Sequence, residues 1–269
     1  MKKGEVYFNW IFILVVGAVF LAFFTGFAIK YKDLQEKKTE IIFLNNLDVA
    51  LTNLQSSSFT TSTNIEMPLD VSVNCDDKGY SIFINENNDV DYIIASKEKL
   101  KDKIYIWYKP YRIPFQATNF YYINDDSPLN IFTNNIELVN SLKGEMPESF
   151  NSRLNVFSGN RFVVNGDMNK GTISIDGKNI PYFGREMLYV AMLSNNYSCF
   201  YNNANREINK AISIYENKAR ILSKRGCNYN LILSKMNLLR NINSADYSIV
   251  EDIEKLNKNL ISINCPGLF

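Results

Sequence analysis

The side chains best able to do acid–base chemistry in this chain are adjacent carboxylates, because histidine is absent. Its absence removes the commonest general base and the commonest metal ligand together. Asp76-Asp77 and Asp125-Asp126 are paired acids of the type that carboxylate-dependent hydrolases use. Turn-forming residues follow each pair, Lys78-Gly79 in the first and Ser127-Pro128 in the second. We therefore interpret both pairs as surface turns.

Motifs for metals and nucleotides are incomplete. Asn85, Asn87 and Asp89 have the first spacing of a calcium loop, but Val90 stands where such a loop needs glycine and Ser96 where it needs glutamate. The four cysteines contain no closely spaced pair of the kind that a zinc site uses. The sequence has no glycine-rich phosphate loop. We predict no catalytic residue, no cofactor and no metal, and we expect a protein that is not an enzyme.

The most distinctive polar stretch combines cations and aromatic residues with Pro110 and Pro114. Proline in a strand favours the edge of a sheet, because it cannot donate a hydrogen bond to a neighbouring strand. One interpretation is an irregular edge strand. The other is an exposed edge that binds a partner through four side chains: Lys109, Tyr111, Arg112 and Phe115.

A long apolar segment near the N-terminus is the clearest structural element that the sequence predicts. The run from Trp10 to Ile29 carries no charge and no proline. As a helix it would span about 30 Å, the thickness of the hydrocarbon core of a bilayer. The run is longer than the apolar part of a cleaved signal peptide, and Trp10 suits a membrane interface. We expect a retained transmembrane anchor, in which Gly17 and Gly26 allow close helix packing.

Sequence periodicity divides the rest of the chain. Apolar residues recur every three or four positions over 30–55, which predicts a long amphipathic helix that continues the anchor. The period then becomes two, and turn signals separate strand-forming runs, which predicts antiparallel strands. Helical periodicity returns after residue 182. The expected fold is α+β, in four parts: a transmembrane anchor (1–30), a stalk helix and linker (31–63), a β-rich domain (64–182) and a C-terminal helical bundle (183–269).

Helix geometry constrains how the four cysteines pair. A helix over 203–225 would hold Cys199 and Cys227 about 35 Å apart, whereas a disulfide needs Cα atoms within about 7 Å. The two helices expected after Cys227 have similar lengths, so the second returns Cys265 to the same end. We predict a Cys227–Cys265 bridge and, by elimination, a Cys75–Cys199 bridge.

The sequence gives conflicting signals about the side of the membrane on which the body lies. Lysines are more numerous after the anchor than before it, which favours a cytoplasmic body. An even number of cysteines favours an oxidising compartment. The glycosylation sequon Asn196-Tyr197-Ser198 is compatible with export. We expect an extracytoplasmic body, and a cytoplasmic one is the alternative.

The N-terminal residues resemble a known class of signal. Lys2-Lys3-Gly4 before a long apolar helix is similar to the class III signal sequences of archaeal type IV pilin-like proteins. In that family a peptidase cuts after the glycine and the apolar helix forms the filament core. The resemblance therefore implies processing between Gly4 and Glu5. Glu5 and Asn9 differ from the glutamine and the acidic residue usual at these positions of the family.

The whole chain also resembles a family of single-anchor membrane proteins of small-genome archaea. The resemblance is carried by Gly4-Glu5-Val6, Tyr31–Gln35, Pro114–Phe120 and Cys265-Pro266. It implies membrane anchoring and an archaeal origin, and no particular activity.

Together these features favour a non-catalytic, single-pass, membrane-anchored surface protein. We expect it to be pilin-like and to act by self-association or by binding other surface proteins. The net charge of +1 gives no basic excess for nucleic acid, so we expect no nucleic-acid partner. Two alternatives stay open: a membrane-anchored, carboxylate-dependent enzyme that acts on surface polymers, and a cytoplasm-facing accessory protein of the membrane.

Overall fold

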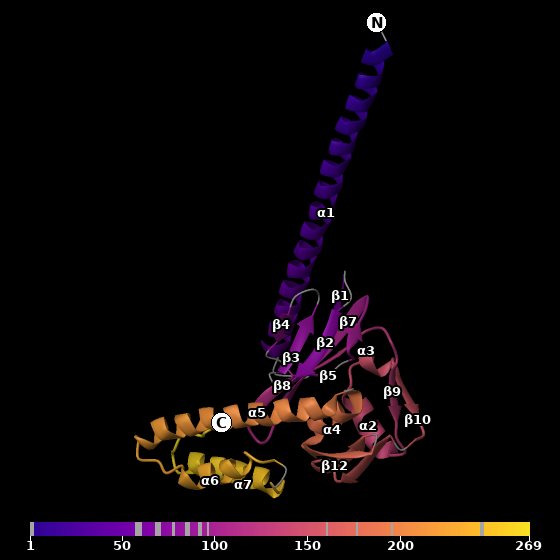
Figure 1. Cartoon of the computed structure of the whole chain (residues 1–269). Coiled ribbons are helices and arrows are strands. Elements are labelled where there is room, and N and C mark those ends of the chain that lie inside the picture. Colours follow the sequence, from indigo (N-terminus) through magenta and orange to yellow (C-terminus); the bar gives the residue numbers. More distant parts are fainter. Residues whose placement is uncertain are drawn as a thin grey trace. The chain divides into compact units, whose positions relative to one another are not determined.

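The computed structural model describes residues 3–56, 61–67, 71–76, 79–83, 87–90, 93–95, 97–159, 161–175, 177–194, 196–242 and 245–269. The chain divides into two compact units, Met1–Asp48 and Val49–Phe269. The predicted α+β class is confirmed: a long apolar helix comes first, mainly antiparallel sheets follow, and helices end the chain (Figure 1). The four sequence-based domain boundaries stay a prediction.

The first unit is built from helix α1 (Lys3–Ser56). Among the described residues, α1 is the one helix that is long and apolar enough to cross a membrane, judged by length and composition. The apolar side chains of its segment Trp10–Ile29 are exposed except for the half-buried Val16, from Trp10 at 71% to Ile29 at 57%. No described atom lies within 4 Å of a Cβ built on Gly17 or Gly26. Such a surface is unfavourable in water and favourable in lipid.

The second unit begins with the last turns of α1, where Leu51 and Leu54 are buried. Its main sheet has the strand order β1-β7-β8-β5, and a second sheet has the order β4-β3-β2-β6. All neighbours are antiparallel except β5 and β8. The strands are β1 (Thr61–Glu66), β2 (Val71–Asp76), β3 (Gly79–Phe83), β4 (Asn87–Val90), β5 (Ile93–Ala95), β6 (Lys99–Leu100), β7 (Lys103–Arg112) and β8 (Gln116–Asn124).

After the main sheet come a parallel pair and an antiparallel three-stranded sheet. The parallel pair is β9 (Leu129–Phe132) with β10 (Leu154–Phe157), and its crossover contains α2 (Ile136–Glu145) and α3 (Glu148–Asn151). The three-stranded sheet is formed by β11 (Phe162–Gly166), β12 (Lys170–Ile175) and β13 (Lys178–Phe183).

Four helices close the second unit: α4 (Arg185–Leu193), α5 (Tyr197–Ser223), α6 (Asn230–Leu238) and α7 (Ser248–Ser262). Helix α5 packs on β8, β5 and β2, and α6 lies beside α7 (Figure 1). Asn196 caps α5, because its side-chain oxygen accepts a hydrogen bond from the Cys199 amide.

The core around β7 and β8 is aromatic. The ring centroids of Trp107 and Tyr122 lie 4.4 Å apart, and those of Tyr111 and Phe120 lie 4.6 Å apart. Phe200 of α5 meets the Phe120 ring edge to face at 4.8 Å. These contacts join the main sheet to the C-terminal helices, so that the second unit shares one core.

Several elements differ from the sequence-based expectation, including β1, α5 and β10. The end of the segment expected as a stalk and linker (31–63) belongs to a strand, because Thr61–Glu66 forms edge strand β1, where β-branched residues suit a pleated surface. Helix α5 begins at Tyr197 rather than at 203, so Cys199 lies in its first turn. Strand β10 was not expected. Asn243-Ser244, residue types that the sequence predicts as a cap for the last helix, lie outside the described residues.

Candidate functional site

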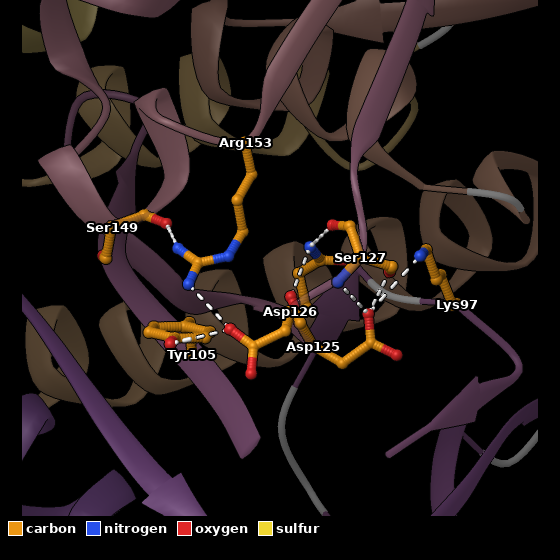
Figure 2. Close-up of polar contacts among 8 residues, drawn as sticks. Lys97, Tyr105, Asp125, Asp126, Ser127, Ser149 and Arg153 are labelled. Carbon is orange, nitrogen blue, oxygen red and sulfur yellow. Dashed lines mark hydrogen bonds and ion pairs between the residues drawn. The ribbon is translucent and has the colours of Figure 1, made fainter. Parts of the chain in front are cut away.

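The adjacent acids Asp125 and Asp126 follow strand β8 and organise a polar turn (Figure 2). Asn124, the last residue of β8, is buried and donates hydrogen bonds to the carbonyl oxygens of Asp125 and Ser127, at 2.9 and 3.0 Å. Asp125 is 8% exposed, whereas Asp126 is exposed. The interpretation of this pair as a turn therefore agrees with the structure. Asp76 of the other pair ends β2, and Asp77 lies outside the described residues.

The carboxylate of Asp125 is held by three donors. The Ser127 amide donates at 3.0 Å, the Ser127 hydroxyl also donates, and the Lys97 ammonium lies at 3.4 Å. Burial by itself raises the pKa of Asp125, but the hydrogen bonds from Ser127 and the charge of Lys97 together bring it below its ordinary value.

The carboxylate of Asp126 is held by Arg153 and Tyr105. The Arg153 guanidinium donates at 2.8 Å and the Tyr105 hydroxyl at 2.9 Å. The same guanidinium lies over the Tyr105 ring, 3.7 Å from its centroid (Figure 2). The hydrogen bonds from Arg153 and Tyr105 lower the pKa of Asp126. Both acids are therefore ionised hydrogen-bond acceptors at neutral pH, which makes them poor general acids.

A pocket of about 210 Å³ lies next to this turn, and Lys97 belongs to both. Its polar lining consists of Lys97, Arg161, Asn130 and Ser194. The apolar lining comes from Pro128, Leu129, Ile131, Phe162, Met192 and Leu193. Two cations, Lys97 and Arg161, are among the described residues that line this pocket, so it suits a small anionic group with an apolar part.

A second charged cluster surrounds Lys109 of β7. The side chain of Lys109 is 9% exposed, forms an ion pair with Glu145 and lies 3.8 Å from Glu186. Arg185 and the Tyr189 hydroxyl also bind Glu145, at 3.1 and 2.9 Å. Burial lowers the pKa of Lys109, and the Glu186 carboxylate opposes that effect. This cluster could not be predicted from the sequence, because Lys109, Glu145 and Glu186 come from separate elements.

Three of the four residues expected to form an exposed partner edge are buried, so the expected exposure is wrong. Tyr111 and Phe115 pack in the aromatic core, where the Tyr111 hydroxyl donates to the Phe183 carbonyl at 2.5 Å. Lys109 is buried among the carboxylates, and only Arg112 is exposed. The physical reason is that α4 and α5 cover this part of the sheet.

The cysteines form the two predicted pairs. Cys75 and Cys199 are bridged with Cα atoms 6.1 Å apart, and Cys227 and Cys265 are bridged with Cα atoms 5.8 Å apart. The first bridge ties β2 to the first turn of α5. The second ties the loop after α5 to the residues after α7.

Within the described residues, no group of three or more Cys, Asp or Glu side chains could hold a metal ion. The calcium-like spacing begins at Asn85, outside the described residues. Comparison with protein families, curated proteins and solved structures finds no match to this chain.

Proposed function

We propose that this chain is a non-catalytic, single-pass membrane protein whose body lies outside the cytoplasm and acts by binding a partner or a second copy of itself. The observation that carries the proposal is one charge-free apolar segment, Trp10–Ile29, joined to a body with two disulfides. Lipid is the favourable solvent for the segment, and disulfides persist in oxidising compartments.

The candidate site supports binding rather than catalysis. Asp125 Oδ1 accepts from Ser127 and Lys97, and Asp126 Oδ1 accepts from Arg153 and Tyr105, which favours a rigid turn over an acid–base pair. The adjacent pocket is lined by the cations Lys97 and Arg161 and by apolar side chains. A surface protein could use it to receive an acidic group of a partner.

Topology is tested with a single cysteine added at Asn179, an exposed position of β13. The four native cysteines are bridged and do not react with maleimide. The Asn179→Cys protein should react with a membrane-impermeant maleimide in intact cells. A matched Asn9→Cys protein, changed before the apolar segment and after the expected cut at Gly4, should react only after the cells are permeabilised. The reverse pattern would show a cytoplasmic body and overturn the proposal.

Self-association is tested at the anchor. Gly17 leaves open space on α1 that a neighbouring helix could approach closely. Gly17→Leu should reduce crosslinked oligomers of the full chain in detergent, and Leu21→Ile, which keeps a large apolar residue, should not. Equal crosslinking of both variants would leave partner binding as the remaining mode of action.

One observation favours the enzyme alternative. A pocket of about 240 Å³ is lined by Glu137 and Asp167. However, the Asp167 carboxylate accepts hydrogen bonds from the amides of Asn169 and Lys170, at 2.7 and 2.9 Å, as turn residues do. Hydrolysis of a surface polysaccharide that is lost in Glu137→Gln would favour the alternative over the proposal.

A further inference from the structure

The sequon Asn196-Tyr197-Ser198 occupies the start of helix α5, and its side chains differ in burial. Tyr197 is buried and its hydroxyl donates to the Pro181 carbonyl at 2.9 Å. Asn196 and Ser198 on either side are exposed. The buried tyrosine therefore fixes the segment while both residues that define a sequon face solvent.

The two ends of the Asn196 amide have separate roles. Its oxygen, Oδ1, caps α5 by accepting from the Cys199 amide at 3.3 Å. Its nitrogen, Nδ2, has no hydrogen-bond partner among the residues that the structure describes. Glycosylation attaches the sugar to Nδ2 of such a sequon. The cap and a glycan on the same residue are therefore compatible.

We infer that Asn196 is an N-glycosylation site, which rests on the proposed extracytoplasmic position of the body. The donor is a lipid-linked oligosaccharide, supplied by a membrane transferase. Asn196 Nδ2 attacks the anomeric carbon of the first sugar and loses one proton to a base of the transferase. The bond between the anomeric carbon and the phosphate oxygen breaks, and the lipid phosphate leaves with the electron pair.

The test uses the full chain, translated in the presence of microsomes that contain the transferase and its donor. Ser198→Ala removes the sequon but keeps Asn196 and its cap. Ser198→Thr keeps the sequon. We expect the wild type and Ser198→Thr to gain mass that an endoglycosidase removes, and Ser198→Ala to gain none.

A second site in the same chain separates failure of this inference from failure of the proposed topology. Asn228-Tyr229-Asn230 precedes α6 with the same pattern, an exposed Asn, a buried Tyr and an exposed third residue. Asn230→Ser converts it into a sequon, and it is placed in the Ser198→Ala background.

Two outcomes distinguish failure of the glycosylation inference from failure of the proposed topology. If Ser198→Ala/Asn230→Ser gains a glycan while the wild type does not, the body reaches the lumen and Asn196 is not a glycosylation site. If neither gains a glycan, the body is not translocated, and both the inference and the proposed topology are overturned.

Discussion

Replacing Lys109 by methionine should destabilise the second unit, because it removes the cation between two carboxylates while keeping most of the apolar stem. The Lys109 side chain is 9% exposed and pairs with Glu145, with Glu186 at 3.8 Å. Removing one partner of a buried ion pair typically costs about 3–5 kcal/mol. Glu145 is 28% exposed and keeps Arg185 as a partner, so we expect a cost at or just below the lower end of that range, about 2–3 kcal/mol.

The assay is urea unfolding of the detergent-solubilised full chain, followed by the fluorescence of buried Trp107. With a denaturant slope of about 2–3 kcal/mol per molar, the midpoint should fall by roughly 1 M. Lys210→Met is the matched control, because Lys210 pairs with Glu207 on an exposed helix surface. Exposed pairs contribute about 0–1 kcal/mol, so its midpoint should hardly change.

A double-mutant cycle with Glu145→Gln separates the ion pair from lost packing. If the Lys109–Glu145 ion pair is the cause, Lys109→Met should lower the free energy of unfolding by less in the Glu145→Gln background than in the wild type. The difference between the two effects, the coupling energy, should be about 1–2 kcal/mol. Equal midpoints for Lys109→Met and Lys210→Met, or a coupling near zero, would refute the reasoning.

Three other expectations concern the second unit. Tyr111→Phe leaves the buried Phe183 carbonyl without its donor and should cost about 1–3 kcal/mol in urea unfolding. The pKa of Asp125 is depressed below its ordinary value of 3.8, so its contribution to stability is complete above that pH and is lost as the pH falls further. Urea midpoints of Asp125→Asn should therefore depend less on pH in the acid range. The double change Cys227→Ser/Cys265→Ser opens a loop with a sequence separation of 38, which should cost about 4 kcal/mol.

Features set by local periodicity could be predicted from the sequence. Most of helix α5 was expected from the sequence, because Ile208, Ala211 and Ile212 belong to an apolar stripe with a helical period. The cysteine pairs followed from helix lengths alone, although α5 begins six residues earlier than expected. The distance between Cys199 and Cys227 stays far too long for a bridge in either case.

Features set by long-range contacts could not be predicted. Lys109, Glu145 and Glu186 are brought together by a strand, the end of one helix and the start of another, and the first two have a sequence separation of 36. The spacing of residue types along the sequence does not indicate a contact between residues this far apart. Proline and two cations suggested an exposed edge around Tyr111, but helices packed against the sheet decide burial there. The parallel pairing of β9 with β10 likewise depends on the intervening helices.

The bridge between Cys75 and Cys199 encloses most of the strands in one covalent ring of the chain, with a sequence separation of 124. A protease that cuts once between these residues therefore releases no fragment. The two pieces remain linked, and they separate only when the bridge is reduced. A nicked molecule would migrate as a single band without reductant and as two bands with it.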